Sequence, residues 1–127
     1  MSDTTPNDTP PDSHADCIFC KIARGEMNAD IVLENDDVVV FRDINPQAPT
    51  HLLVIPRKHI PSLEDAADED GELLGKVYLA ARDAARKEGI AHEGYRTVLN
   101  TGANGGQVVF HLHVHLLGGR AMGWPPG

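Results

Sequence analysis

Three things are scarce in this chain of 127 residues: long apolar runs, basic residues and cysteines. No apolar run approaches the roughly 20 residues that a membrane helix requires, and the first residues lack the basic start and apolar core of a secretory signal. The net charge of −8 disfavours binding to a nucleic-acid backbone. We therefore expect a cytoplasmic protein that binds neither membranes nor nucleic acid. In that reducing compartment, Cys17 and Cys20 are predicted to be metal ligands or redox groups rather than a disulfide.

Residues 1–16 differ in composition from the rest of the chain. They are rich in Pro, Asp, Thr and Ser and contain no large apolar side chain after Met1. Such a segment cannot bury enough surface to offset the entropy that is lost on ordering. We predict a disordered, acidic, Pro-rich tail over residues 1–16 and a single domain over residues 17–127.

The domain sequence combines two helical segments with five β-type segments. Apolar spacing predicts a short helix from Cys17 to Gly25 and a long amphipathic helix, with Asp68 as its N-cap and Gly89 as its C-cap. The apolar stripe of the long helix is expected in the core or in a subunit interface. Strands are predicted over residues 31–34, 38–41, 51–55, 95–100 and 111–117. One crossing helix without βαβ alternation favours an α+β fold with a mainly antiparallel five-stranded sheet.

Three histidines occupy every second position of an apolar segment near the C-terminus: His111, His113 and His115. Alternation along a strand places the apolar residues between them in the core and the three imidazoles on the opposite face. Buried imidazoles need partners for both nitrogens, so this face is predicted to be a functional site. A histidine there can bind a catalytic metal, transfer protons or attack phosphorus, and the spacing alone does not decide between these roles.

A glycine-rich segment, residues 100–108, comes directly before the histidines. Because glycine has no Cβ, the backbone N–H groups of such a loop can approach an anion closely. Beside imidazoles, a loop lined with donors suits a phosphorus centre that carries negatively charged oxygens.

Several motifs together resemble one known family. Residues 111–117 match the His-φ-His-φ-His-φ-φ signature (φ, apolar) of the histidine triad (HIT) family. Further motifs resemble its Hint branch: CIFCKI at 17–22, FRDINPQAP at 41–49, HLLVIP at 51–56, GGQ at 105–107 and WPPG at 124–127. The resemblance covers residues 17–127. It implies the HIT fold, a homodimer, and cleavage of purine nucleoside phosphoramidates to AMP or GMP and an amine.

The resemblance also implies roles for individual residues. His113 is the nucleophile that forms a nucleotidyl-imidazole intermediate, His115 contacts the phosphate and assists departure of the amine, and His51 has a supporting role. Asp43, with Ile44 beside it, accepts hydrogen bonds from the ribose hydroxyls. The positions that bind the α-phosphate are Asn100, Gly106, Gln107 and Val108. The candidates for an apolar purine slot, which can equally be ordinary core, are Phe19, Ile22, Phe41 and Ile44.

The two cysteines form half of a zinc site or a redox pair. A redox pair normally begins a helix in a βαβ context, which this sequence lacks. A closed structural zinc site needs four nitrogen or sulfur ligands. In the zinc-binding members that this chain resembles, the remaining ligands match two histidines. The resemblance therefore implies a structural zinc, and no catalytic metal, on Cys17, Cys20, His59 and His111.

Val108 departs from the hydroxyl residue that is common at this position in the family, and its side chain offers no donor to the phosphate. A nucleotide-binding adaptor with little turnover is therefore one alternative to the phosphoramidate hydrolase. A second alternative is a zinc-dependent hydrolase with His113 and His115 as ligands. Within the enzyme class, dinucleoside polyphosphate hydrolysis and nucleotidyl transfer stay open, although the Trp-Pro-Pro-Gly ending resembles the Hint branch.

Overall fold

The computed structural model describes residues 16–127, and the structural statements below concern this part of the chain. The predicted tail, residues 1–16, lies outside the described residues apart from Asp16. The described part contains two α-helices, five strands and two short 3₁₀ helices. Their bounds are α1 Ile18–Ala23, β1 Ile31–Glu34, β2 Val38–Arg42, β3 Thr50–Pro56, η2 Leu63–Asp65, η3 Asp68–Asp70, α2 Gly71–Lys87, β4 Tyr95–Val98 and β5 Val114–Gly118.

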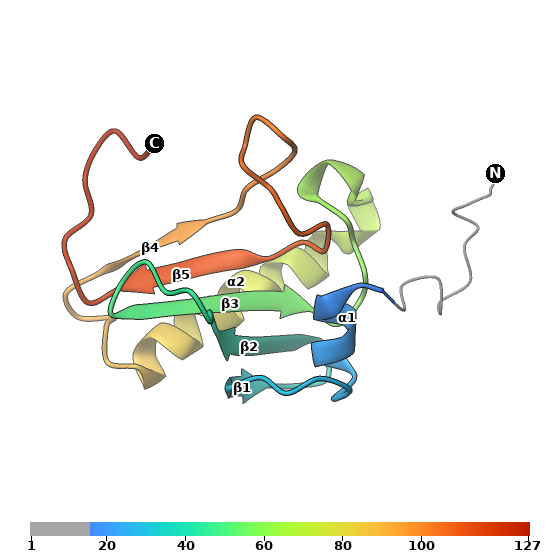
Figure 1. Cartoon of the computed structure of the whole chain (residues 1–127), viewed down its shortest axis with the longest axis horizontal. Helices are drawn as coiled ribbons and strands as arrows, with labels where there is room; N and C mark the ends of the chain where they lie inside the picture. The colour runs from blue at the N-terminus through green and yellow to red at the C-terminus, as the bar shows by residue number, and fades with distance from the viewer. Residues whose placement is uncertain (1–15) are drawn as a thin grey trace.

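The five strands form one sheet in the order β1-β2-β3-β5-β4 (Figure 1), and each neighbouring pair is antiparallel. In the central pair, Leu53 of β3 lies opposite His115 of β5, and His51 lies opposite Leu117. The prediction of an α+β fold with an antiparallel five-stranded sheet, one long helix and one short helix is confirmed.

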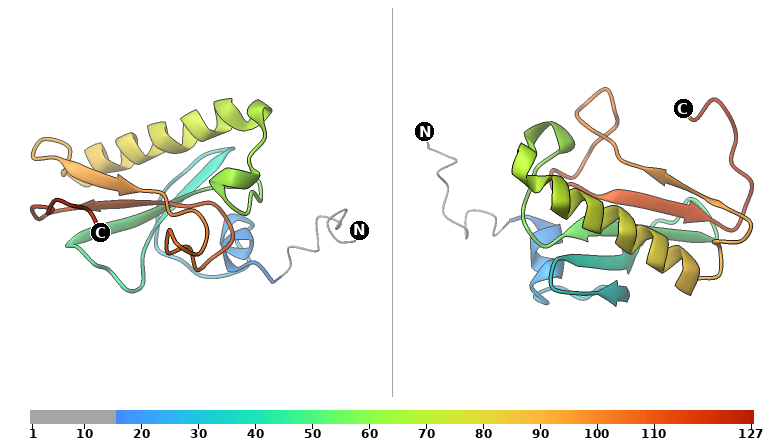
Figure 2. Two further views of the ribbon diagram at one scale, coloured as in Figure 1. Left: turned by 90° about the horizontal axis from the view of Figure 1, so that it is seen from above. Right: turned by 180° about the vertical axis from the view of Figure 1, so that it is seen from behind.

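Helix α2 covers one face of the sheet, as the view from above in Figure 2 shows. Alternate residues of the strands point to this face, among them Val40, Val54 and Val114, and they pack with Val77 and Ala81 of the helix. All five side chains are buried. Because this layer is apolar, the polar groups of β3 and β5 are confined to the other face.

The other face carries α1 and the long loops (Figure 2). Apolar side chains of α1, β2 and β3 form a second buried cluster there: Phe19, Ile22, Ala23, Val39, Phe41, Leu53 and Ile55. Since Leu53 pairs with His115, the histidines continue the same face beyond the edge of this cluster.

Three predicted boundaries are wrong. Strand β5 begins at Val114 rather than at residue 111, because the N–H of Leu112 donates to the carbonyl of Ile60 at 2.7 Å outside the sheet. Strand β4 ends at Val98 rather than at residue 100. Helix α2 begins after Asp70 rather than after Asp68, which starts the 3₁₀ helix η3.

The C-terminus of α2 and its apolar stripe also differ in detail from the prediction. The C-cap is Glu88, and the predicted Gly89 follows it with a φ of 78°. Tyr78, expected in the stripe, is exposed. No helix of the described part is long and apolar enough to cross a membrane.

Candidate active site

His113 lies immediately before β5, and its ring is held in one orientation. Its Nδ1 atom is 2.9 Å from the carbonyl oxygen of His111. A carbonyl can only accept, so we assign the proton to Nδ1, and Nε2 of the neutral ring then carries the free electron pair. The ring of Phe19 packs edge-on against His113, with the centroids 5.1 Å apart. His113 therefore presents Nε2 as a nucleophile or base.

His51 and His115 form a chain of hydrogen bonds whose direction is set by the backbone. The N–H of Gln47 donates to Nδ1 of His51 at 3.0 Å. Neutral His51 must then carry its proton on Nε2, which lies 2.9 Å from Nδ1 of His115. His115 accepts this proton in a hydrogen bond, so its own proton is on Nε2. The chain thus makes His115 a donor at Nε2, whereas His113 has its free electron pair at Nε2.

The charges of the two histidines agree with this assignment. Burial, followed by the neighbouring rings of His113 and His51, lowers the pKa of His115 to about 4. Burial also lowers the pKa of His51, against the opposing effect of Asp43. The rings of His51 and His115 are therefore neutral near pH 7. The ring centroids of His113 and His115 are 5.0 Å apart.

Asp43 lies beside this pair. Its Oδ2 is 3.4 Å from Nε2 of His51, and its Oδ1 accepts the N–H of Asn45 at 2.8 Å. The ligand atoms of Asp43, His51 and His115 are within 4.8 Å of one another, close enough to surround a metal ion. However, metal binding at Nε2 of neutral His51 would move the ring proton to Nδ1, toward the N–H of Gln47. This cluster is therefore suited to hold a proton rather than a metal.

The loop before the histidines is tied down by Gln107, which is buried. Its side-chain oxygen accepts the N–H of Gly102, and its side-chain amide donates to the carbonyls of Pro61 and Val109. Gly105 permits the tight turn, because a Cβ on it would lie 2.4 Å from the carbonyl oxygen of Thr101. Gln107 thus shapes the loop through its side chain, which contacts protein groups on all three bonds.

The other predicted nucleotide-binding residues fall into two groups. The first group is buried in the second core cluster and contributes to the core: Phe19, Ile22 and Phe41. In contrast, Ile44 is fully exposed and Val108 is 83% exposed. Asn100 is half-buried and Gly106 is exposed at the loop that precedes the histidines.

The predicted metal ligands converge from three separate segments. Nδ1 of His111 is 3.4 Å from both Cys17 Sγ and Cys20 Sγ, and Nδ1 of His59 is 3.2 Å from Cys20 Sγ. All four ligand atoms lie within 4.8 Å of one another. A tetrahedral zinc with ordinary Zn–S and Zn–N bonds places such atoms about 3.5 Å apart. The four residues therefore fit a closed zinc site.

The hydrogen bond of His111 and the burial of Cys20 bear on this cluster. The second nitrogen of His111, Nε2, is 2.8 Å from the carbonyl oxygen of Pro56, which leaves Nδ1 as the ligand atom. Burial, followed by the hydrogen bond and charge of Cys17, raises the pKa of the Cys20 thiol to about 12. A bound metal would have the opposite effect, because a coordinating thiol is deprotonated.

Comparison with known proteins places the chain in a family. Residues 24–122 match the HIT domain. The chain belongs to the HIT family. This HIT protein is 51% identical over 106 residues to purine nucleoside phosphoramidase from Escherichia coli, which covers 84% of this chain and 89% of the relative. It is 55% identical over 112 residues to an uncharacterised HIT-like protein from Synechococcus elongatus, covering 88% and 97% of the two chains.

Solved structures agree. A HIT family hydrolase from Legionella pneumophila matches with a TM-score of 0.85 and 54% identity, covering 87% of this HIT protein and 99% of the other chain. A histidine triad protein from Clostridium difficile matches with a TM-score of 0.83 and 42% identity, covering 85% and 94%. The resemblance stated from the motifs and the predicted HIT fold are confirmed.

Sequence reasoning missed the backbone partners of the histidines in this HIT protein. The N–H of Gln47 and the carbonyls of Pro56 and His111 decide which nitrogen of each ring is protonated. Residue type carries no signal for such contacts, because any residue except proline offers the same N–H. They depend on the path of the loops and could be found only in the folded chain.

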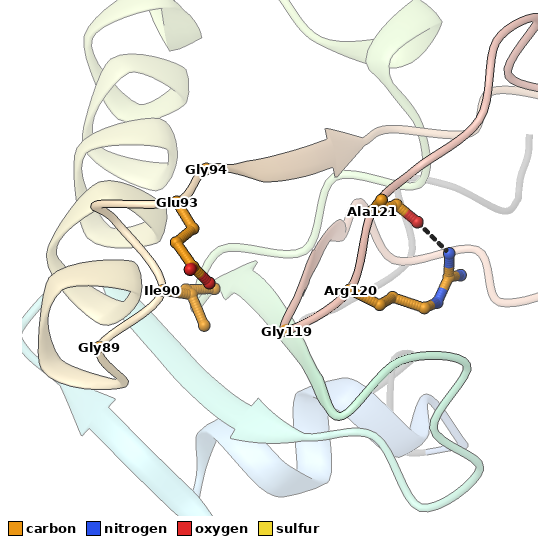
Figure 3. Close-up of a pocket in the computed structure, with 7 residues that line it drawn as sticks. All are labelled: Gly89, Ile90, Glu93, Gly94, Gly119, Arg120 and Ala121. Carbon is orange, nitrogen blue, oxygen red and sulfur yellow. Dashed lines mark hydrogen bonds between the residues drawn. The ribbon is translucent and has the colours of Figure 1, made fainter.

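A cavity of about 380 Å³ lies away from these histidines, where the end of α2 meets the segment after β5 (Figure 3). None of the predicted site residues lines this cavity. The lining residues are Gly89, Ile90, Glu93, Gly94, Gly119, Arg120 and Ala121. Arg120 nevertheless touches the site indirectly, since its Nε and Nη2 donate to the carbonyl oxygen of Gln47 at 3.3 and 3.0 Å.

Proposed function

We propose that this HIT protein hydrolyses the P–N bond of purine nucleoside 5′-phosphoramidates and releases a nucleoside monophosphate and an amine. The observation that carries the proposal is the opposite polarity of two adjacent rings: an electron pair on Nε2 of His113 and a proton on Nε2 of His115. A phosphoryl centre between them meets a nucleophile and a hydrogen-bond donor. The phosphoramidase activity named for the Escherichia coli relative supports this choice of reaction.

The reaction takes two steps. Nε2 of His113 attacks phosphorus and the P–N bond breaks. Nε2–H of His115 donates a hydrogen bond to the departing group, and the amine nitrogen takes up a proton from solvent. The nucleotidyl-imidazolium on His113 lies beside the neutral ring of His115. Water then attacks phosphorus, releases a proton to solvent and frees His113. The products are a nucleoside monophosphate and an amine, and both rings regain their starting protonation.

The proposed nucleotide contacts surround these two rings. Asp43 accepts hydrogen bonds from the ribose hydroxyls, with Ile44 against the sugar. The phosphate is held by Asn100, Gly106 and the backbone of Val108. Gln107 acts by shaping this loop, since its side chain is bonded to Gly102, Pro61 and Val109. The purine lies against the apolar cluster of Phe19, Ile22 and Phe41, with His51 in its supporting role behind His115. The exposure of Ile44 and Val108 leaves both accessible to a ligand.

A structural zinc completes the proposal, with Cys17, Cys20, His59 and His111 as its ligands. When bound, zinc would crosslink the segments that carry these residues and take no part in the reaction. His113 belongs to neither group of described residues that could surround a metal, which disfavours a zinc hydrolase that uses it as a ligand. A reducing compartment, the cytoplasm, would keep the two thiols available for the metal.

We also propose a homodimer. Strand β4 is an edge of the sheet, and its Tyr95 is 38% exposed. Helix α2 exposes Tyr78 and Leu79. An unpaired edge and apolar side chains are features that a second copy of the chain would cover. Light scattering coupled to size exclusion measures the mass directly, and a monomeric mass at micromolar concentration contradicts this part of the proposal.

The decisive experiment uses adenosine 5′-phosphoramidate and follows AMP release by the parent protein and by His113→Ala, with circular dichroism to establish that both are folded. We expect turnover by the parent and a loss of roughly a thousandfold or more in the variant. A folded parent that binds AMP without turnover supports the nucleotide-binding adaptor instead. Equal turnover by the two proteins rejects His113 as the nucleophile.

A further inference from the structure

The segment that follows β5 contacts the loop of residues 43–49 at two points. Gly119 has a φ of 88°. A Cβ on it would lie 2.9 Å from Cβ of Pro49, so these two residues are in close contact. Next to it, the guanidinium of Arg120 donates twice to the carbonyl oxygen of Gln47. A third hydrogen bond, from Nη1 to the carbonyl of Ala121, holds the guanidinium in place (Figure 3).

Gln47 is the residue whose N–H begins the hydrogen-bond chain to His51 and His115. Its carbonyl is held by Arg120, and its N–H sets the proton of His51. A shift of Gln47 would release Nδ1 of His51 from its donor, and the ring could then carry its proton on either nitrogen. The same ambiguity would pass to His115, because it receives its hydrogen bond from His51.

We propose that Arg120 is a positioning residue, which holds Gln47 so that the backbone sets the tautomers of His51 and His115. Arg120 touches neither ring and lies on the lining of a separate cavity, so it acts through the loop. A guanidinium is suited to this task, because its planar fork places two donors on one carbonyl oxygen. The catalytic consequence of this role rests on the proposed phosphoramidase function, whereas the tautomers can be observed without any substrate.

The test compares Arg120→Ala with Arg96→Ala in the full chain. Arg96 also holds the C-terminal residues, by donating to the carbonyl of Gly123 rather than to the loop of residues 43–49. Nitrogen-15 spectra of the histidine rings, at a mildly alkaline pH where both rings are neutral, report which nitrogen carries each proton. Thermal unfolding of each variant establishes that it is folded under these conditions.

We expect one tautomer each for His51 and His115 in the parent and in Arg96→Ala, and mixed or averaged tautomers in Arg120→Ala. Arg120→Lys, which keeps one donor for the carbonyl of Gln47, should restore part of the parent pattern. Parent-like ring signals in folded Arg120→Ala overturn the proposal. If the parent hydrolyses adenosine 5′-phosphoramidate, kcat of Arg120→Ala should fall by roughly ten- to a hundredfold. An inactive parent with altered tautomers in Arg120→Ala would reject the phosphoramidase function and retain the positioning role.

Discussion

At the scale of single residues, the charge of His115 makes the stability of the protein depend on pH. The pKa of His115 is about 4 in the folded protein, chiefly because of burial, whereas an unfolded histidine titrates near 6.5. Between these values the unfolded chain binds a proton that the folded chain does not. The free energy of unfolding should therefore fall as the pH is lowered from about 6.5 to about 4.

His115→Gln removes this titration and should flatten the dependence of stability on pH. Urea unfolding of the parent and the variant across this range measures the two slopes. His51 and the zinc ligands remain in both proteins, so the difference between the slopes reports His115 itself. Equal slopes would mean that the ring of His115 is as solvated in the folded chain as in the unfolded one.

The resemblance to the family implies a hydroxyl residue at the position of Val108. Its side chain is 83% exposed, so replacing it should cost little stability. Val108→Ser adds a hydroxyl beside the proposed phosphate position, and a donor that acts in the transition state is worth roughly ten- to a thousandfold in rate. We expect kcat on adenosine 5′-phosphoramidate to rise by about tenfold with little change in the melting temperature.

Val108→Thr tests the same hydroxyl on a β-branched side chain like that of valine. An increase of kcat in both variants attributes the gain to the hydroxyl. An increase in neither means that the missing hydroxyl at position 108 does not limit turnover.

At the scale of elements, the loop between β4 and β5 depends on one glycine more than on the others. A Cβ on Gly105 would lie 2.4 Å from the carbonyl oxygen and 2.9 Å from the nitrogen of Thr101, both backbone atoms that cannot rotate away. Gly105→Ala should therefore shift the loop and lower the free energy of unfolding by about 1–3 kcal/mol. The position of Gln107 should move with it, which would raise KM for the nucleotide.

Gly75→Ala is the matched control. Gly75 lies within α2, and nothing is within 4 Å of a Cβ placed on it. Alanine should stabilise the helix by about 0.5–1 kcal/mol and leave KM unchanged. Urea unfolding gives both free energies, and a Gly105→Ala variant as stable as the parent would show that the loop adapts without cost.

The elements also show how far the sequence could predict the fold and the site. Short apolar runs bounded by turn residues identified all five strands, because this pattern is local. Strands β2 and β3 are buried on both faces, with Val40 and Val54 toward α2 and Val39 and Ile55 toward α1. The start of β5 was missed because a contact with Ile60, distant in the sequence, takes the N–H of Leu112 out of the sheet. Similarly, the sequence predicted that the histidines form a functional site. Their tautomers follow from the N–H of Gln47 and the carbonyl of His111, which no pattern of residue types encodes.

For the molecule as a whole, the candidate metal site joins segments that are far apart in the chain. Cys17 and Cys20 come from the start of α1, His59 follows β3, and His111 precedes β5, up to 94 residues away. A metal there would tie α1 to the two central strands, so its binding energy would contribute to folding. We expect about one zinc per chain in the purified protein and a fall of more than about 10 °C in the melting temperature when a chelator removes it.

The same experiment separates a structural zinc from a catalytic one. Loss of a structural zinc should lower activity only in proportion to the fraction that unfolds, because neither His113 nor His115 belongs to the group of ligands that contains the cysteines. Cys20→Ala should bind no zinc and should melt at the same temperature with and without the chelator. Exposed His92, outside both clusters, provides the control: His92→Ala should keep its zinc and the full response. If the chelated protein stays folded but loses all turnover, and readdition of zinc restores it, the zinc is catalytic rather than structural.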